Sequence, residues 1–169
     1  MIINNREYDS NGINYTIRSA IAKDAKDLSV LRVQIDGETE NLDREKGEAF
    51  IDVTGFEQII KTDTERPRNI FLVAVVDDRL VGFSRCEGIY LTRFSHKVEF
   101  GVCLLKEVWG YGIGKNLLKE SISWADSNGI KKMTLNVLET NSKGIKLYKN
   151  LAFEIEGVLK RDKILSDGK

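Results

Sequence analysis

The sequence has few of the residue types that staple small secreted proteins together or bind metals. It contains two cysteines, Cys86 and Cys103, one histidine, His96, and one proline, Pro67. Neither cysteine belongs to a CxxC pair, and His96 has no Cys or His neighbour at the spacing of metal ligands. We therefore expect no disulfide framework and no metal site, and the free cysteines are typical of a protein of the reducing cytoplasm.

The chain also lacks a long apolar run and an excess of charge of one sign. No segment approaches the roughly 18 apolar residues of a membrane span, and no signal-peptide pattern opens the sequence, so we expect no membrane association. Lys and Arg total 26, as do Asp and Glu, so the net charge is zero. Proteins that coat nucleic acid carry a basic excess, which argues against nucleic acid as a partner.

The zero net charge hides an uneven distribution along the chain. Residues 36–66 carry ten acidic and four basic side chains, and residues 97–169 carry thirteen basic and nine acidic ones. The first segment is therefore strongly acidic and the second basic. A cleft lined by charge of one sign concentrates ligands of the other sign, so this polarity bears on function.

The 169 residues fit one domain. Hydropathy periods predict strands at 15–18, 70–76, 80–86, 98–105, 133–138 and 153–163, and helices at 22–37, around 56–65, from 113 to the stop at 128–129, and at 142–151. We expect residues 1–12 to be a loose start, the ordered core to span 14–163, and 164–169 to be peripheral. This order predicts an α/β (α+β) fold with helices around one central sheet.

The clearest functional pattern lies where the strand at 98–105 leads into a helix. Gly110, Gly112 and Gly114 alternate there, so the backbone can come close to a ligand and present the free N–H groups of a helix start to a phosphate. A tight turn with nothing bound is the alternative. The Walker pattern fails because Asn116 follows Gly114-Lys115, and the GxGxxG pattern of dinucleotide folds is incomplete because Lys115 stands at its third glycine.

The segment Trp109–Gly114 resembles the acyl-coenzyme A pyrophosphate loop of the GNAT family of N-acetyltransferases. The family pattern is (Gln/Arg)-x-x-Gly-x-(Gly/Ala), which Gly112 and Gly114 match, whereas Trp109 replaces the usual Gln or Arg. A second stretch, from Asn141 to Leu147–Phe153, resembles the family's Asn-x-x-(Ala)-x-x-Leu-Tyr-x-x-x-Gly-Phe, with Ala152 in place of glycine. The resemblance implies a mostly antiparallel mixed sheet flanked by helices and an acetyl-CoA site.

The resemblance also implies which residues bind the cofactor. The backbone of the strand would bind the pantetheine arm like an added strand, through Val102, Cys103 and Leu104. The loop and helix start would bind the pyrophosphate, through Trp109, Gly110, Tyr111, Gly112, Ile113, Gly114 and Lys115. Asn141 matches a cofactor-contacting position, although Asn is also a common N-cap of a helix.

The family transfers acetyl directly from the thioester to an amine, which requires an acid and a base. Tyr148 matches the family's general acid, because a phenol can protonate the departing thiolate at neutral pH. Glu99 is the candidate base, since apolar neighbours in the strand would raise the pKa of its carboxylate and so suit it to accept a proton. Glu87 is the second candidate. A salt-bridged glutamate and a core tyrosine are the alternatives. We expect His96 to be a surface residue.

The resemblance implies that the segment after the first strand, here residues 36–66, lines the acceptor site. Its acidity then favours a small cationic amine, which is a polyamine, an amino sugar, or an amino acid or peptide amine, and a solvated acidic face is the alternative. The family adds one strand after the one predicted at 153–163, and the sequence ends at an Asp-Gly turn signal where it would begin. We expect either that the sequence is truncated there or that a second chain completes the sheet as a homodimer. An NAD(P)-type dinucleotide enzyme and a silent acyl-CoA-binding module are the alternative functions.

Overall fold

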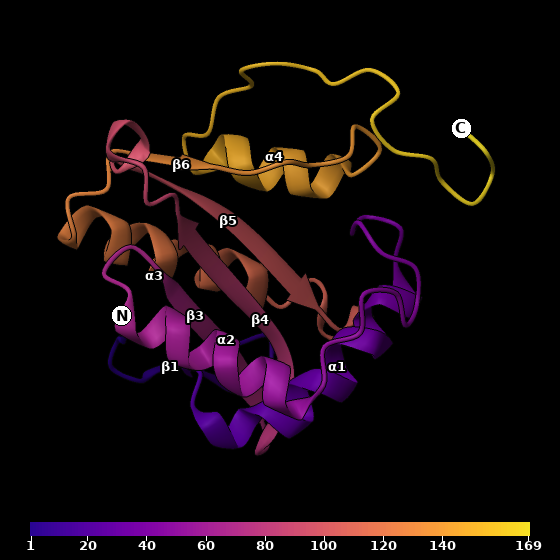
Figure 1. The fold of residues 1–169 in the computed structure, drawn as a ribbon. Helices are drawn as coiled ribbons and strands as arrows, with labels where there is room; N and C mark the ends of the chain where they lie inside the picture. The colour runs from indigo at the N-terminus through magenta and orange to yellow at the C-terminus, as the bar shows by residue number, and fades with distance from the viewer.

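A computed structural model describes residues 1–169, and one curved sheet runs through the chain (Figure 1). Its six strands lie in the order β1-β2-β3-β4-β5-β6. The strands are β1 (Arg6–Ser10), β2 (Ile13–Ser19), β3 (Ile70–Val76), β4 (Arg79–Gly88), β5 (Lys97–Leu104) and β6 (Lys132–Thr134). Neighbouring strands are antiparallel except β5 and β6, which are parallel. The predicted α/β class with a mixed, mostly antiparallel sheet is confirmed.

Four helices cover the two faces of this sheet. They are α1 (Ala25–Glu38), α2 (Val53–Glu65), α3 (Ile113–Ser127) and α4 (Ser142–Asn150). Helices α1 and α2 lie on one face and α3 on the other, while α4 lies beside β6 (Figure 1). No helix of the chain combines the length and the apolar character that crossing a bilayer requires.

Apolar side chains from both faces of β3 and β4 form the core. Phe56 of α2 packs edge-on against Phe71 of β3 and Phe83 of β4, with ring centroids 6.5 Å apart in each pair. On the opposite face Cys86 lies near Ser121 of α3, and both are buried. Because β3 is buried on both faces, its sequence is a continuous apolar run rather than an alternating one.

The expectation of a loose start at residues 1–12 is wrong, because β1 forms a hairpin with β2. Asn11 and Gly12 connect the strands with φ angles of 51° and 82°. Asn-Gly favours the turn with positive φ at both central positions, which matches the twist of paired strands. The hairpin supports α3, because the Tyr15 hydroxyl accepts a hydrogen bond from Asn116 Nδ2 at 2.5 Å.

The end of the sheet is shorter than predicted. The expected strand at 133–138 is reduced to β6 (Lys132–Thr134), and the expected strand at 153–163 does not form. Residues 153–163 have the composition of a strand, yet Val158 and Leu159 are about 70% exposed because no neighbouring strand covers them. Hydropathy predicts which backbone can extend, whereas a strand also needs a partner.

The arrangement also bears on the alternative of a dinucleotide enzyme. Such folds use a doubly wound parallel sheet. Here β5-α3-β6 is the one parallel unit, and the remaining strand pairs are antiparallel. The topology contradicts that alternative.

Candidate active site

Strands β5 and β6 separate after three paired positions. Their register pairs Lys97 with Lys132 and ends at Glu99 with Thr134. Beyond that point β5 continues to Leu104 with β4 as its only neighbour. The edge of β5 that carries Val102, Cys103 and Leu104 is therefore open, and an unpaired edge offers backbone donors and acceptors to an extended ligand.

A row of unpaired N–H groups follows the short turn that ends β5. None of the N–H groups from Gly110 to Lys115 donates a hydrogen bond within the chain, and the first helical bond of α3 runs from Asn116 N–H to the Gly112 carbonyl at 3.0 Å. Gly110 and Gly112 have φ angles of 85° and 80°, which only glycine adopts freely. These groups lie at the positive end of the α3 dipole, a geometry that favours an anion, and we call residues 110–115 the anion-binding loop.

Two side chains of the loop have defined places. The Trp109 indole is 38% exposed, and its N–H donates to the Leu104 carbonyl at 3.3 Å. Trp109 therefore joins the loop to the end of β5. Ile113 is buried and anchors the first turn of α3, whereas Lys115 is exposed beside the unpaired N–H groups.

Asn141 caps α4, as one of its two interpretations predicted. Its side-chain oxygen accepts a hydrogen bond from Gly144 N–H at 3.0 Å. The cap favours glycine at position 144, because a Cβ there would lie only 2.7 Å from Asn141 Nδ2. A contact of Asn141 with a cofactor stays a prediction.

Tyr148 is held in place by the way α4 ends. Phe153 N–H donates to the Tyr148 carbonyl at 3.0 Å, and Ala152 N–H donates to the Lys149 carbonyl at 3.1 Å. These two bonds form a Schellman motif, in which the side chains that bracket the helix end also pack together. The rings of Tyr148 and Phe153 do so at 5.9 Å, edge to face. Burial, and then the nearby Cys103 thiol, raise the pKa of Tyr148.

Cys103 lies on the face of β5 that α1 covers, close to Tyr148 and a group of charged residues. Arg32 and Asp36 of α1 and Arg44 from the following loop act on it electrostatically. Burial raises the pKa of the Cys103 thiol to about 11, so the group is neutral at physiological pH. A neutral thiol is a poor nucleophile, which favours direct transfer over an acyl-cysteine route.

Glu99 does not have the apolar surroundings that the sequence predicted. It is exposed on β5, directly opposite Glu87 of β4. Glu87 is paired with Arg85 at 2.8 Å, whereas no cation lies within ion-pair distance of Glu99. Strand alternation puts Glu99 on the same face as Cys103. His96 is exposed, as expected.

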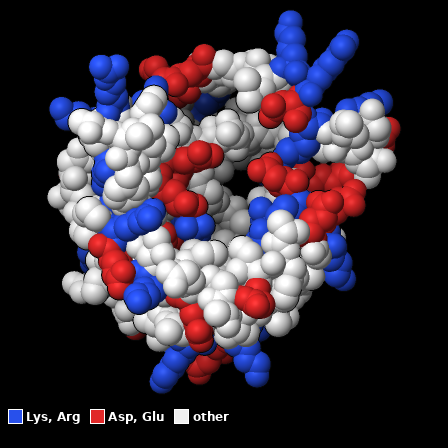
Figure 2. Space-filling view, in the orientation of Figure 1, with Lys and Arg blue, Asp and Glu red and all other residues white.

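The acidic segment is less acidic in space than in sequence. Asp36 accepts two hydrogen bonds from Arg44, at 2.9 and 3.1 Å, and Asp63 accepts two from Arg85, at 2.7 and 3.1 Å. Both carboxylates are buried, so they are neutralised inside the molecule. Figure 2, drawn in the orientation of Figure 1, shows a hollow near the middle of the molecule with both acidic and basic side chains around it.

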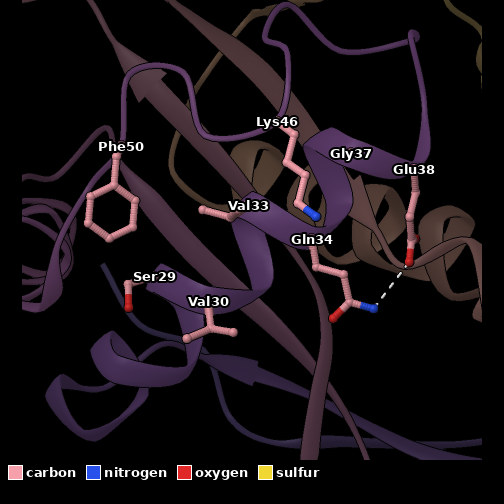
Figure 3. Close-up of a pocket in the computed structure, with 8 residues that line it drawn as sticks. All are labelled: Ser29, Val30, Val33, Gln34, Gly37, Glu38, Lys46 and Phe50. Atoms are coloured by element: carbon pink, nitrogen blue, oxygen red, sulfur yellow. Dashed lines mark hydrogen bonds between the residues drawn. The ribbon is translucent and has the colours of Figure 1, made fainter.

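A pocket of about 480 Å³ lies on the outer side of α1, between this helix and the segment at 46–50 (Figure 3). It is lined by Ser29, Val30, Val33, Gln34, Gly37, Glu38, Lys46 and Phe50. None of the predicted site residues reaches it. No group of three or more His, Cys, Asp or Glu side chains is arranged to bind a metal ion.

The family model of the acetyltransferase (GNAT) family matches residues 20–153, which include the open edge, the anion-binding loop and α4. The chain belongs to the GNAT family. This GNAT protein is 33% identical over 98 residues to the L-amino acid N-acetyltransferase AaaT of Escherichia coli (strain K12). The matched stretch covers 57% of this chain and 60% of that protein, so the match spans less than two thirds of the relative.

Solved structures agree with the family. An acetyltransferase of the GNAT family from Streptococcus pneumoniae superposes with a TM-score of 0.88 at 26% identity, over 92% of this chain and 93% of that one. The putative acetyltransferase yncA from Salmonella typhimurium, solved with acetyl-CoA, has a TM-score of 0.79 at 18% identity, over 90% and 86% of the two chains. The second likeness concerns the fold alone.

The charged group beside Cys103 was not predicted from the sequence. Arg32, Asp36 and Arg44 belong to no motif recognised in the sequence. Asp36 was counted there only as one of the acidic residues of the segment 36–66. The spacing of Arg32 and Asp36, four residues apart on a helix, puts them on one face and is the one available signal. That Arg44 folds back onto this face depends on the loop that follows α1, which hydropathy does not determine.

Proposed function

We propose that this chain transfers the acetyl group of acetyl-CoA directly to the primary amine of a small acceptor. One observation carries the proposal: the open edge of β5 is followed, after one short turn at Leu105–Trp109, by the unpaired N–H groups of Gly110–Lys115. An extended amide-bearing arm that ends in a pyrophosphate fits this combination, because the edge pairs with amides and the loop binds phosphate oxygens. When bound, acetyl-CoA supplies the activated acetyl group.

Residues of the chain then bind and orient the cofactor and transfer the protons of the reaction. The backbone of Val102–Leu104 orients the arm, and the loop fixes its phosphate end. Tyr148, near the open edge, donates a proton to the departing thiolate, and its raised pKa keeps that proton available at neutral pH. Glu99, with no ion-pair partner, accepts a proton from the acceptor ammonium so that the neutral amine can attack.

The class of the acceptor is supported less directly than the transfer of acetyl itself. The acidic segment favoured a small cationic amine, but its two buried carboxylates are neutralised by arginines. The relative named for L-amino acids favours an amino acid among the classes that the sequence left open. We therefore place an α-amino acid first and a polyamine or amino sugar second.

Acetyl transfer is tested by following CoA release with acetyl-CoA and a panel of L-amino acids, aminoglycosides and spermidine. We expect turnover with at least one amine, and a loss of about 10²–10⁴-fold in kcat for Tyr148→Phe and for Glu99→Gln, the range typical of a general acid or base. Tyr8→Phe is the matched control, because its hydroxyl bonds Glu120 on the other side of the sheet. Binding of acetyl-CoA without turnover of any amine would indicate a silent binding module instead.

A further inference from the structure

Arg32 differs from every other arginine of the chain in its burial and its partners. It is 9% exposed and is the only arginine among the buried residues. Its guanidinium makes one hydrogen bond, from Nη1 to the Ala49 carbonyl at 2.6 Å. No carboxylate lies within ion-pair distance of it, whereas Arg18, Arg44 and Arg85 each pair with an aspartate.

The charge of Arg32 is not balanced by its surroundings. Asp36, one helical turn away, is already bound by both Nε and Nη2 of Arg44. The Cys103 thiol beside the group is neutral. Arg32 and Arg44 therefore share Asp36, and the largely buried guanidinium of Arg32 has no carboxylate of its own. Isolated buried charges are costly, and proteins retain them where a ligand supplies the counter-charge.

The free donors of Arg32 have access to a ligand. Its Nε and Nη2 make no hydrogen bond, yet neither is among the buried polar atoms sealed from solvent. Arg32 and Cys103 are electrostatic neighbours, and so are Cys103 and Tyr148. The guanidinium thus lies near Cys103, on the face of β5 that α1 covers, and Cys103 in turn lies near Tyr148.

We propose that Arg32 is the specificity-determining residue of the acceptor site and binds the carboxylate of an α-amino acid whose amine is acetylated. This inference rests on the proposed acetyl transfer. A guanidinium matches a carboxylate through two parallel N–H···O bonds, which neither an amide nor an ammonium ligand reproduces. The same cation repels polyamines, so the acceptor is a zwitterion rather than a polycation.

The test compares acceptors that differ only at the carboxylate. For the L-amino acid with the highest turnover, kcat/KM is measured against that of its primary amide. We expect the wild-type protein to prefer the acid by about 100-fold, as a buried charged contact provides. In Arg32→Gln the acid-to-amide ratio should fall about 100-fold, mainly through KM for the acid, and Arg32→Lys should restore part of it.

Two further measurements separate recognition from folding. The KM for acetyl-CoA should stay within two-fold in the Arg32 variants, and Arg32→Met should melt no lower than the wild type, because it removes an uncompensated charge. Arg18→Gln is the matched control, since it breaks the ion pair between Arg18 of β2 and Asp24 and should leave the acid-to-amide ratio unchanged.

The outcomes are distinguishable. Turnover of amines with no preference for the carboxylate, or a preference that Arg32→Gln keeps, overturns the role of Arg32 and leaves the acetyltransferase proposal standing. A marked loss of melting temperature in Arg32→Met assigns the residue to structure and also overturns it. No turnover of any amine overturns both proposals.

Discussion

Ala152→Gly should stabilise the protein, although it removes a methyl group. Ala152 follows α4 with a φ of 68°, in the left-handed region. This conformation costs a residue with a Cβ about 1–2 kcal/mol. Glycine avoids that cost but loses about 0.5–1 kcal/mol more backbone freedom on folding. The difference leaves a gain of about 0.5–1 kcal/mol for the variant.

Calorimetry measures this gain directly. A change of 1 kcal/mol shifts Tm by about 2–4 °C in a domain of this size, so Ala152→Gly should raise Tm by about 1–4 °C. Asn150→Gly is the matched control: this exposed residue is the last of α4, where glycine gains no strain relief and lowers stability by about 0.3 kcal/mol relative to Asn. The Schellman bonds persist in Ala152→Gly, so kcat/KM should stay within two-fold. A Tm equal to or below that of the wild type would refute the strain argument.

Two other predictions concern Cys103 and Asp63. With a thiol pKa of about 11, only about one Cys103 in 10,000 is thiolate at pH 7. Mass spectrometry after incubation with acetyl-CoA alone should therefore show no acetylated protein, and double-reciprocal plots of initial rate against the two substrates should give intersecting lines. Parallel lines would contradict direct transfer. Asp63→Asn leaves the Arg85 guanidinium without its buried partner and should cost about 3 kcal/mol, the low end for such pairs because Arg85 keeps Glu87. Denaturant unfolding checks this value, and a loss below 1 kcal/mol would show that the pair is dispensable.

The proposed role of Tyr148 as general acid predicts the alkaline limb of the pH profile. In that role the protonated phenol is the active form, and burial raises its pKa above the usual value of about 10. Activity that depends on this proton is therefore retained as pH rises through 9 and is lost only above the raised pKa. A rate that falls with an apparent pKa of about 8, and still does so in Tyr148→Phe, would assign that limb to another group.

The sequence predicted elements well where local pattern decides them. The apolar run of β3, the helical period of α3 and the glycines of the anion-binding loop each depend on neighbours in the chain. The β1–β2 hairpin was missed although Asn11-Gly12 carried its signal, because the polar residues before it hid the strand. The length of β6 depends on where two strands diverge, which no local pattern reports.

The candidate site divides in the same way. Glycine spacing predicted the turn at Gly110–Gly114, whereas the role of Val102–Leu104 came from the family resemblance and stays a prediction. The exposure of Glu99 was not predictable, since it depends on what covers that face of β5, and the pairing of Asp36 with Arg44 was not, since it depends on how the loop after α1 folds back. A count of charges along the chain could not show which of them cancel.

The open edge of β5 also has a consequence for the protein without its cofactor. Unpaired edges of sheets recruit strands from other molecules, and proteins ordinarily cover them or place charge along them. Val102, Cys103 and Leu104 bring no charge to this edge. A ligand that lies along this edge, as proposed for acetyl-CoA, therefore also covers a surface that is open to self-association.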